Sequence, residues 1–259
     1  MMSSTQAPPA RHIIVGAGVG SGLNAQAAEE GGADFVACYS TAIYRVNSLN
    51  SMLSFLPYGD CNALVMETFP AIRAACRTGM PKFIGLGVHD PRLQIPALLE
   101  QAFALGADGF VNEPFAGAYG AQIQSALDRE GLGFSRELKA LDYCVQSGHG
   151  ALGWAFTPQQ AQEIAALGVP YVGIMLEFLP GEQIPQLAAR AEALTRLIRK
   201  ENPAAAVLLH GKPFENADIL CQVLRLSSAD GYFTGSALER AAVRQAICDK
   251  IGFYKKILN

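Results

Sequence analysis

A short junction recurs along the chain wherever a helix-like stretch gives way to an apolar one. Four copies occur, at residues 32–36 (GADFV), 106–111 (GADGFV), 168–172 (GVPYV) and 228–233 (SADGYF). One further strand–helix pair fits between successive copies, so the junctions would begin the second, fourth, sixth and eighth strands of a series. This pattern predicts an α/β chain closed into a single (β/α)8 barrel. Because barrel sites lie at the carboxyl ends of the strands, the repeated aspartates are expected to be structural, capping turns at the barrel floor.

The expected elements follow from apolar runs and from helix start and stop signals. The expected strands cover residues 12–18, 34–40, 82–88, 110–113, 151–156, 171–176, 206–210 and 231–234. The expected helices cover residues 21–31, 62–78, 95–105, 121–130, 136–147, 184–200 and 216–226, with one more starting at Thr157-Pro158 and a closing helix that ends near residue 258. Residues 41–61 form the one long irregular stretch, a length usual for a functional lid. We expect one barrel domain over residues 12–259, preceded by a disordered tail over 1–11.

Composition narrows the class of protein. Half of the 259 residues are apolar and 17% are charged, which is typical of a compact globular domain. The formal charge of −3 argues against a nucleic-acid partner. Six scattered cysteines without a Cys-x-x-Cys pair, and no apolar run long enough for a membrane span, predict a cytoplasmic protein with reduced thiols. A homo-oligomer is expected, because residues 41–61 contain only two charged side chains.

The predicted strand exits gather polar residues that an apolar barrel would not otherwise hold at its rim. They are Gly16, Gly18, Tyr39, Ser40, Gly87, His89, Asp90, Asn112, Glu113, Trp154, Phe156, Glu177, His210, Gly211, Lys212, Thr234, Gly235 and Ser236. Holding polar groups there is costly without a purpose. The rim is therefore predicted to bind a small molecule.

Two glycine-containing turns are candidate anion sites. Residues 16–22 (GAGVGSG) fail the G-x-G-x-x-G spacing, so no nicotinamide or flavin cofactor is expected. Their free N–H groups at a helix start could still hold a phosphate or carboxylate, or form only a tight turn. Gly235 and Ser236, after the eighth strand and beside His210 and Gly211, favour anion binding, with simple turn chemistry as the alternative.

Four charged or titratable residues in the first half of the chain have two interpretations each. Arg45 is the only cation in the long stretch and could bind a carboxylate, phosphonate or phosphate, or be a solvated surface residue. Asp60 could cap the next helix or serve as a metal or acid–base residue. His89 at a strand end could polarise a carbonyl or move a proton, whereas Asp90 could be only a cap.

Three further residues are candidates for chemistry. Glu113 and Glu177 end the fourth and sixth strands, and each could be a base or an oxygen ligand for Mg²⁺. Lys212 is the only lysine near the rim, which leaves a Schiff base open. A lysine followed by proline is, however, more often an exposed or anion-facing charge.

Several segments together resemble one known family. They are residues 16–23, 30–34, 44–46, 56–62 (LPYGDCN), 87–88, 90–91, 210–211 and 233–240 (FTGSALER). In this order they resemble the phosphoenolpyruvate hydrolase-like TIM-barrel family, whose members are often labelled phosphonopyruvate hydrolases. A plant antiviral resistance protein has a related barrel. The resemblance implies a (β/α)8 fold and a site for a small oxo acid or phosphorylated acid.

The chain departs from the family pattern at three strand exits. Leu176-Glu177 stands where a His-Gly pair is usual, residues 40–43 replace Asn-Ser-Gly-Arg, and Glu113 replaces the Phe of Asn-Phe-Pro. The acids gained, Glu113 and Glu177, are therefore suspected of new chemistry.

The leading hypothesis is an enzyme, hydrolase or lyase, that makes or breaks a bond next to the carbonyl of a 2-oxo acid or related dicarbonyl through an enolate. Its predicted residue roles are as follows: Glu177, His210 and His89 catalytic; Arg45, Tyr39, Ser40, Asn112, Gly211, Gly235 and Ser236 binding the small anionic substrate; and Asp90, Glu113 and Asp60 holding Mg²⁺. A non-catalytic anion- or nucleotide-binding interaction barrel and a Schiff-base aldolase using Lys212 are the alternatives.

Overall fold

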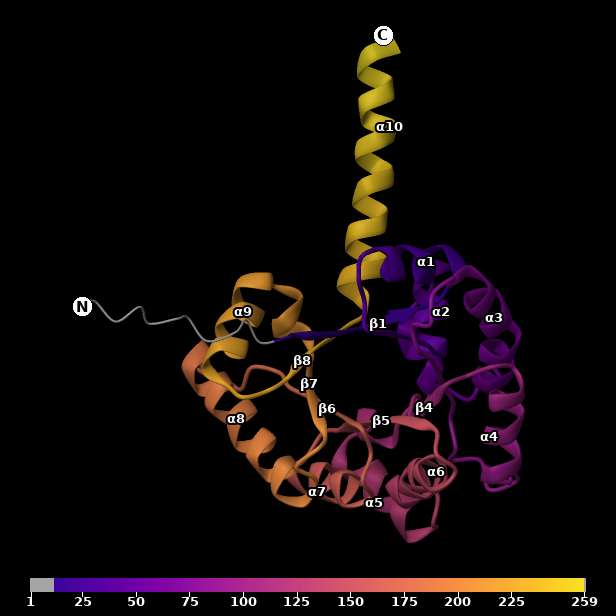
Figure 1. Ribbon diagram of the computed structural model, residues 1–259, viewed down its shortest axis with the longest axis vertical. Coiled ribbons are helices and arrows are strands. Elements are labelled where there is room, and N and C mark those ends of the chain that lie inside the picture. The colour runs from indigo at the N-terminus through magenta and orange to yellow at the C-terminus, as the bar shows by residue number, and fades with distance from the viewer. Residues whose placement is uncertain (1–11, 259) are drawn as a thin grey trace, which may run out of the picture.

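The computed structural model describes residues 12–258 and shows a closed barrel of eight parallel strands in sequence order (Figure 1). The strands are β1 (Ile14–Val19), β2 (Phe35–Cys38), β3 (Lys82–Gly85), β4 (Gly109–Val111), β5 (Gly150–Ala155), β6 (Tyr171–Met175), β7 (Ala206–His210) and β8 (Gly231–Thr234). Closure comes from the pairing of β1 with β8. The predicted (β/α)8 fold is confirmed. The predicted tail, residues 1–11, lies outside the described residues.

Helices alternate with the strands and surround the barrel. They are α1 (Gly22–Glu30), α2 (Ser40–Val46), α3 (Cys61–Ala75), α4 (Ile95–Ala104), α5 (Ala121–Arg129), α6 (Phe134–Gln146), α7 (Pro158–Ala166), α8 (Ile184–Glu201), α9 (Ala217–Leu226) and α10 (Arg244–Leu258), with short helical turns η1 (Ser51–Phe55), η2 (Ala116–Ala118), η3 (Lys212–Glu215) and the π-helical η4 (Ala237–Val243). In the described part of the chain, no helix is both long and apolar enough to cross a membrane.

The stretch predicted to be irregular, residues 41–61, contains two ordered helical segments instead. α2 covers its first part, with its first four residues buried, and η1 follows. The N-cap residue of α2 is Tyr39, whose side chain makes no capping bond, so the usual sequence signal of a helix start is missing. This segment supplies Thr41, Arg45, Ser51, Met52 and Phe55 to a pocket at the carboxyl ends of the strands.

The repeated aspartates are structural, as predicted, and the structure shows how. The Asp34 carboxylate accepts the backbone N–H of Val15 at 2.7 Å, and the Asp108 carboxylate accepts that of Lys82 at 2.8 Å. Each carboxylate thereby caps the first residues of the preceding strand. This satisfies donors at the barrel floor that would otherwise lack a partner.

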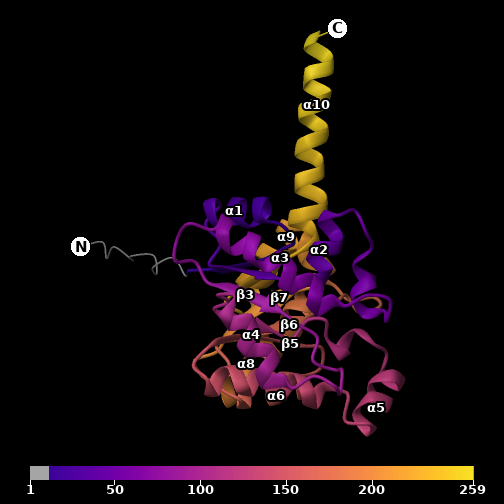
Figure 2. The same ribbon diagram turned by 90° about the vertical axis from the view of Figure 1, so that its right-hand side faces the viewer.

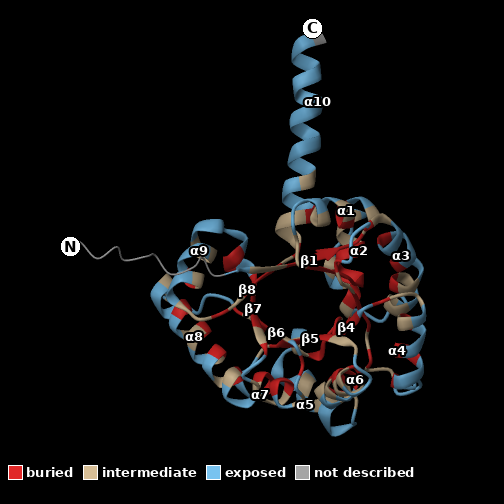
Figure 3. Cartoon of the chain, in the orientation of Figure 1, coloured by how far each residue is buried: buried red, intermediate tan, exposed pale blue. Residues whose placement is uncertain are grey.

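Large side chains fill the lower part of the barrel interior. Phe35 packs against Phe83, Tyr171 and Phe233, with ring centroids 4.9 to 5.8 Å apart. A second apolar layer lies between the strands and the surrounding helices, so the burial runs around the whole barrel wall (Figure 3). Because aromatic rings plug the floor, ligands can enter only from the carboxyl ends of the strands.

The predicted closing helix does not close the barrel. After η4, α10 runs straight away from the body of the molecule (Figure 2). Its described side chains are exposed along its whole length. The predicted helix end near residue 258 is confirmed, and η4 continues into α10 without a turn that could bring the helix back against the barrel.

Candidate active site

A pocket of about 360 Å³ opens at the carboxyl ends of the strands. Its lining comes from β-strand exits around much of the barrel and from the α2–η1 segment: Tyr39, Thr41, Arg45, Ser51, Met52, Phe55, Glu113, Phe115, Ala118, Trp154, Met175, His210, Ser236 and Arg240. Five predicted site residues, namely Tyr39, Arg45, Glu113, His210 and Ser236, meet here.

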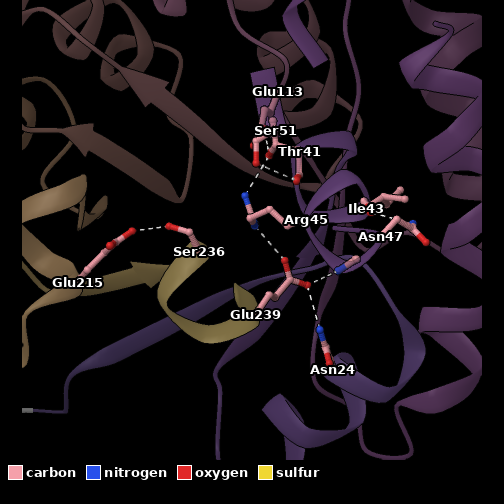
Figure 4. A network of polar contacts seen from close by, with 11 residues as sticks. Asn24, Thr41, Ile43, Arg45, Asn47, Ser51, Glu113, Glu215, Ser236 and Glu239 are labelled. Carbon is pink, nitrogen blue, oxygen red and sulfur yellow. Dashed lines mark hydrogen bonds and ion pairs between the residues drawn. The ribbon is translucent and has the colours of Figure 1, made fainter. Parts of the chain in front are cut away.

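Arg45 is the central cation of this pocket (Figure 4). Its Nε donates to Glu239 at 3.1 Å, and both side chains are nearly inaccessible to solvent, at 7% and 0% exposure. Nη1 lies 3.5 Å from the hydroxyl of Thr41, whereas Nη2 is buried and has no hydrogen-bond partner among residues 12–258. The solvated-surface interpretation of Arg45 is therefore wrong. Both N–H groups of Nη2 are left without a well-aligned acceptor in the described chain, although the Tyr39 hydroxyl also interacts with the guanidinium.

Glu239 is the anion that the glycine-rich turn after β1 binds. Its Oε1 accepts the Gly20 N–H at 2.7 Å and the Asn24 amide at 3.2 Å. A Cβ at Gly20 would lie 2.3 Å from the backbone oxygen of Ala42, so only glycine fits this turn. A side chain of the same chain thus occupies the candidate phosphate site of residues 16–22 and fixes Arg45 at the same time.

Glu113 lies on the side of Arg45 opposite to Glu239 and is buried. Thr41 Oγ1 donates to its Oε1 at 2.5 Å. Burial raises the pKa of Glu113 from 4.5 to about 7, although Thr41 and Arg45 both act to lower it. A carboxyl group with a pKa near neutrality can hold a proton and release it during a reaction.

This pKa predicts a measurable pH dependence of stability. A carboxyl group whose pKa is raised by folding stabilises the folded state below its unfolded pKa, and that contribution is lost as pH rises from 4.5 through 7. Wild type should lose about 3 kcal/mol more unfolding free energy across this window than Glu113→Gln does. Urea denaturation of both proteins between pH 4.5 and pH 8 measures this. Parallel curves would contradict the raised pKa, since all other titrating groups are shared.

His210, at the end of β7, has a defined tautomer. Its Nδ1 lies 2.7 Å from the backbone oxygen of Phe233, and because a carbonyl oxygen only accepts, Nδ1 must carry hydrogen. Burial lowers the pKa of His210, so the ring is neutral near pH 7. Nε2 is then the basic nitrogen of a histidine that lines the pocket.

Gly235 forms the surface between these groups. A Cβ built on it would lie 3.5 Å from Arg45 Nη2, 3.6 Å from His210 Cε1 and 3.6 Å from Tyr39 Oη. Trp154, whose ring is 4.9 Å from that of His210, contributes a buried Nε1–H that also lacks a partner within the described chain. Two unpaired donors, from Arg45 and Trp154, therefore line one pocket.

A second hollow adjoins the pocket and shares Met175, His210, Ser236 and Arg240 with it. Its lining adds Glu177, Gly211, Lys212, Glu215, Tyr232 and Gly235. Glu177 is exposed and accepts the backbone N–H of Lys212 at 3.1 Å. Ser236 donates its hydroxyl to Glu215. These residues form the outer edge of the site.

Three predicted binding or catalytic residues do not reach the pocket. Ser40 Oγ donates to Ser54 at 2.9 Å in the buried base of α2. Asn112 donates its amide to Glu137 and accepts the backbone N–H of Trp154 at 2.7 Å, so it joins β4 to β5. His89 donates from Nδ1 to the Leu132 oxygen at 2.9 Å, and its Nε2 faces Glu137.

The predicted Mg²⁺ ligands do not fit a metal site. Asp60 caps α3 by accepting the N–H of Ala63, and Asp90 forms an exposed ion pair with Arg92. Only Glu113 of the three lies in the pocket. Within residues 12–258, no three His, Cys, Asp or Glu side chains come close enough to hold an ion. We therefore assign no reaction step to a metal.

The family model described as phosphoenolpyruvate hydrolase-like matches residues 4–257. The chain belongs to this family. The resemblance drawn from the sequence motifs is thereby confirmed.

Two relatives of this phosphoenolpyruvate hydrolase-like chain come from tomato. It is 27% identical over 253 residues to the ToMV susceptible protein tm-1(GCR26) of Solanum lycopersicum, covering 94% of this chain and 33% of that protein. It is 28% identical over 257 residues to the ToMV resistance protein Tm-1(GCR237) of the same plant, with the same coverage. The chain thus spans about a third of these relatives' length.

Solved structures confirm the barrel fold. A phosphonopyruvate hydrolase in complex with oxalate and Mg²⁺ superposes with a TM-score of 0.63 at 14% identity, covering 94% of this chain and 82% of that one. At this identity the likeness concerns the fold alone.

Three residues of the site have no role in the sequence predictions. Glu239 orients Arg45, Thr41 binds Glu113, and Trp154 presents an N–H that is unpaired within the described chain. Trp154 is visible in the sequence as a strand exit, and Glu239 lies in the FTGSALER motif that supports the family resemblance. Neither signal indicates the contact between Glu239 and Arg45 or the unpaired Nε1–H of Trp154.

Proposed function

We propose that this barrel is an enzyme that makes or breaks a bond next to the carbonyl of a 2-oxo acid or related dicarbonyl, through an enolate. One observation supports this most: the buried N–H groups of Arg45 and Trp154 lack acceptors among residues 12–258, in a pocket that also holds Glu113 and His210. An anionic, oxygen-rich ligand would satisfy both donors. The titratable pair would then manage the proton that enolate chemistry requires.

The proposed roles follow from the contacts. Arg45 Nη2 binds the carboxylate of the substrate, with Tyr39 Oη beside it, and Trp154 Nε1 donates to the carbonyl oxygen as it gains charge. Cleavage of a C–C or C–P bond leaves its electron pair on the carbon next to this carbonyl. His210 Nε2 takes the proton of the attacking water or of the substrate hydroxyl. Glu113, protonated before the reaction, gives its proton to the enolate carbon.

This assignment changes the predicted catalytic carboxyl group. The sequence predicts Glu177 as the base, but it is exposed at the outer edge of the site, whereas Glu113 is buried in the pocket with a pKa of about 7. Lys212 is also exposed, and a Schiff-base lysine is usually desolvated. The geometry therefore favours Glu113 over both for the chemical step.

The test measures binding and turnover separately. Oxalate, pyruvate and phosphonopyruvate, each with and without Mg²⁺, are titrated calorimetrically into wild type, Glu113→Gln and Glu177→Gln, and substrate consumption is followed by NMR. We expect all three proteins to bind, and Glu113→Gln alone to lose turnover. Loss of turnover in Glu177→Gln instead would restore the role predicted from the sequence.

Two other results would favour the alternative functions. Tight anion binding by wild type with no turnover of any compound would indicate the non-catalytic interaction barrel. The similarity of this chain to the resistance and susceptibility proteins of tomato is the reason to keep this alternative. A substrate adduct trapped by borohydride on Lys212 would indicate the aldolase.

A further inference from the structure

The pocket has one polar side and one apolar side. Arg45, His210 and Ser236 lie on the side formed by α2 and the exits of β7 and β8. In the closed strand order, β4 lies across the barrel from β8 (Figure 1). The side away from β8, the apolar wall, is formed by η1 and by the segment that follows β4, through Met52, Phe55, Phe115 and Ala118.

Contacts between its two segments hold the apolar wall together. The ring centroid of Phe55 lies 5.5 Å from that of Phe115, and Phe115 packs against Phe156 at 4.6 Å. Tyr119, directly after η2, meets the Phe55 ring edge-on at 6.3 Å, and its hydroxyl donates to the Phe55 backbone oxygen at 2.8 Å. The wall is therefore in place before a ligand binds, and it offers aromatic rings to an apolar group.

The apolar wall also leaves apolar surface open to the pocket. Met52 is 55% exposed and Phe55 is half-buried, and both line the pocket. The pocket volume of about 360 Å³ is within the range of sites that enclose drug-sized ligands, which are larger than pyruvate. A ligand that fills this pocket therefore extends from Arg45 to an apolar surface.

The positive charges of the pocket lie away from the apolar wall. Of the pocket-lining residues in the described chain, Arg45 and Arg240 are the two with a permanent positive charge. Arg45 is on the polar side, paired with Glu239, and Arg240 is exposed on η4, beyond β8. A substrate carboxylate can bind Arg45, but a second anionic group against the apolar wall would lose its hydration without gaining a cation.

We infer that the substrate is a 2,4-dioxo acid with an apolar 4-acyl group, aromatic or branched, and that the enzyme breaks the bond between carbons 3 and 4. This inference rests on the proposed function, whose enolate it assigns to one class of substrate. The carboxylate and the 2-carbonyl group bind Arg45 and Trp154, and the apolar part of the acyl group lies against the apolar wall.

The reaction is then the hydrolysis of a C–C bond. The oxygen of water bonds to carbon 4 while His210 Nε2 takes one proton of that water. The bond between carbons 3 and 4 breaks, and its electron pair stays on carbon 3 as the enolate of pyruvate. Glu113 gives its proton to carbon 3. The products are pyruvate and the carboxylic acid of the acyl group, which ionises in water, and proton exchange with solvent restores His210 and Glu113.

The first test compares four compounds that all release pyruvate on hydrolysis: benzoylpyruvate, its para-carboxyl derivative, acetylpyruvate and phosphonopyruvate. The value of kcat/KM for wild type is measured by proton NMR of pyruvate, with and without Mg²⁺. Benzoylpyruvate should exceed acetylpyruvate by about 30-fold, because its phenyl ring is buried against the apolar wall. It should exceed the para-carboxyl derivative and phosphonopyruvate by about 100-fold, because these bring a second anionic group. A kcat/KM for acetylpyruvate or phosphonopyruvate that equals that for benzoylpyruvate would overturn the inference.

A variant of the apolar wall tests whether this surface sets the preference. Met52→Lys adds a cation at an exposed position, so it should lower kcat/KM for benzoylpyruvate and raise that for the para-carboxyl derivative, each by about 10-fold. The matched control is Leu49→Lys, because Leu49 is 48% exposed in the same connecting segment but does not line the pocket. It should keep the wild-type ratio. An unchanged ratio in Met52→Lys, or an equal change in Leu49→Lys, would contradict the role of the wall.

The same measurements separate this inference from the proposed function. Consumption of phosphonopyruvate or acetylpyruvate, but not of benzoylpyruvate, would contradict the substrate class and leave the enolate chemistry standing. Consumption of none of the four compounds, together with no deuterium exchange into pyruvate, would contradict the proposed function and the substrate class together.

Discussion

Arg45→Met should destabilise the protein by about 3–5 kcal/mol, because it leaves the Glu239 carboxylate buried without its cation. The two side chains form an ion pair at 3.1 Å that solvent hardly reaches. Glu239 also holds the turn at Gly20 and the side chain of Asn24, so its position connects β1, α1, α2 and η4. Urea denaturation at pH 7 measures the loss.

Two controls make this prediction specific to the buried pair. Adding Glu239→Gln to Arg45→Met removes the unpaired charge but keeps an acceptor for Gly20, so the double variant should be less destabilised than the sum of the single variants. The same substitution at an exposed pair, Arg92→Met, should leave stability unchanged within error, since its partner Asp90 lies at the surface. Equal effects at Arg45 and Arg92 would contradict the structural role of the pair.

Gly235→Ala should weaken binding of oxalate or pyruvate by about 100-fold while leaving the fold intact. The added methyl group would touch Arg45, His210 and Tyr39 at ordinary contact distances of 3.5 to 3.6 Å, so the protein can accommodate it. A ligand oxygen bound to Arg45 Nη2 and Tyr39 would have to occupy the same space. Isothermal titration calorimetry measures the affinity, and circular dichroism checks the fold.

The matched control for this prediction is Gly79→Ala. Gly79 is exposed, before β3 at the barrel floor, and a methyl group added there would meet no described heavy atom within 4 Å. This variant should bind the ligand like wild type. Unchanged affinity in Gly235→Ala would mean that the ligand does not lie between Arg45 and His210.

The fold can be predicted from the sequence because its signal is repeated. Each junction pairs a helix end with a strand start, and in three of the four copies its aspartate accepts a backbone N–H of the preceding strand. The sequence pattern does not reveal α2, because this helix is short and starts without a capping side chain. It does not reveal the direction of α10 either, because amphipathic spacing shows that a helix has an apolar face, but not whether that face packs against the barrel of its own chain.

The site can be predicted only in part. Residues at a strand exit differ in whether the side chain faces the barrel interior, and in how far they lie beyond the end of the strand. Side chains alternate along a strand, so Glu113 faces the barrel interior with Val111, whereas Asn112 faces outward toward Glu137. His89 lies four residues beyond the end of β3 at Gly85, where the chain has already left the rim. Glu239 reaches Arg45 across 194 residues, a contact that no local pattern indicates.

Exchange of the methyl protons of pyruvate for deuterium tests the proposed enolate most directly. In D₂O, wild type should accelerate the exchange, measured by proton NMR, because Glu113 and His210 move protons between solvent and the carbon next to the carbonyl. Glu113→Gln should lose at least about 99% of this acceleration, and Glu177→Gln should keep it. Binding of pyruvate without any acceleration by wild type, or equal acceleration by Glu113→Gln, would contradict the proposed chemistry.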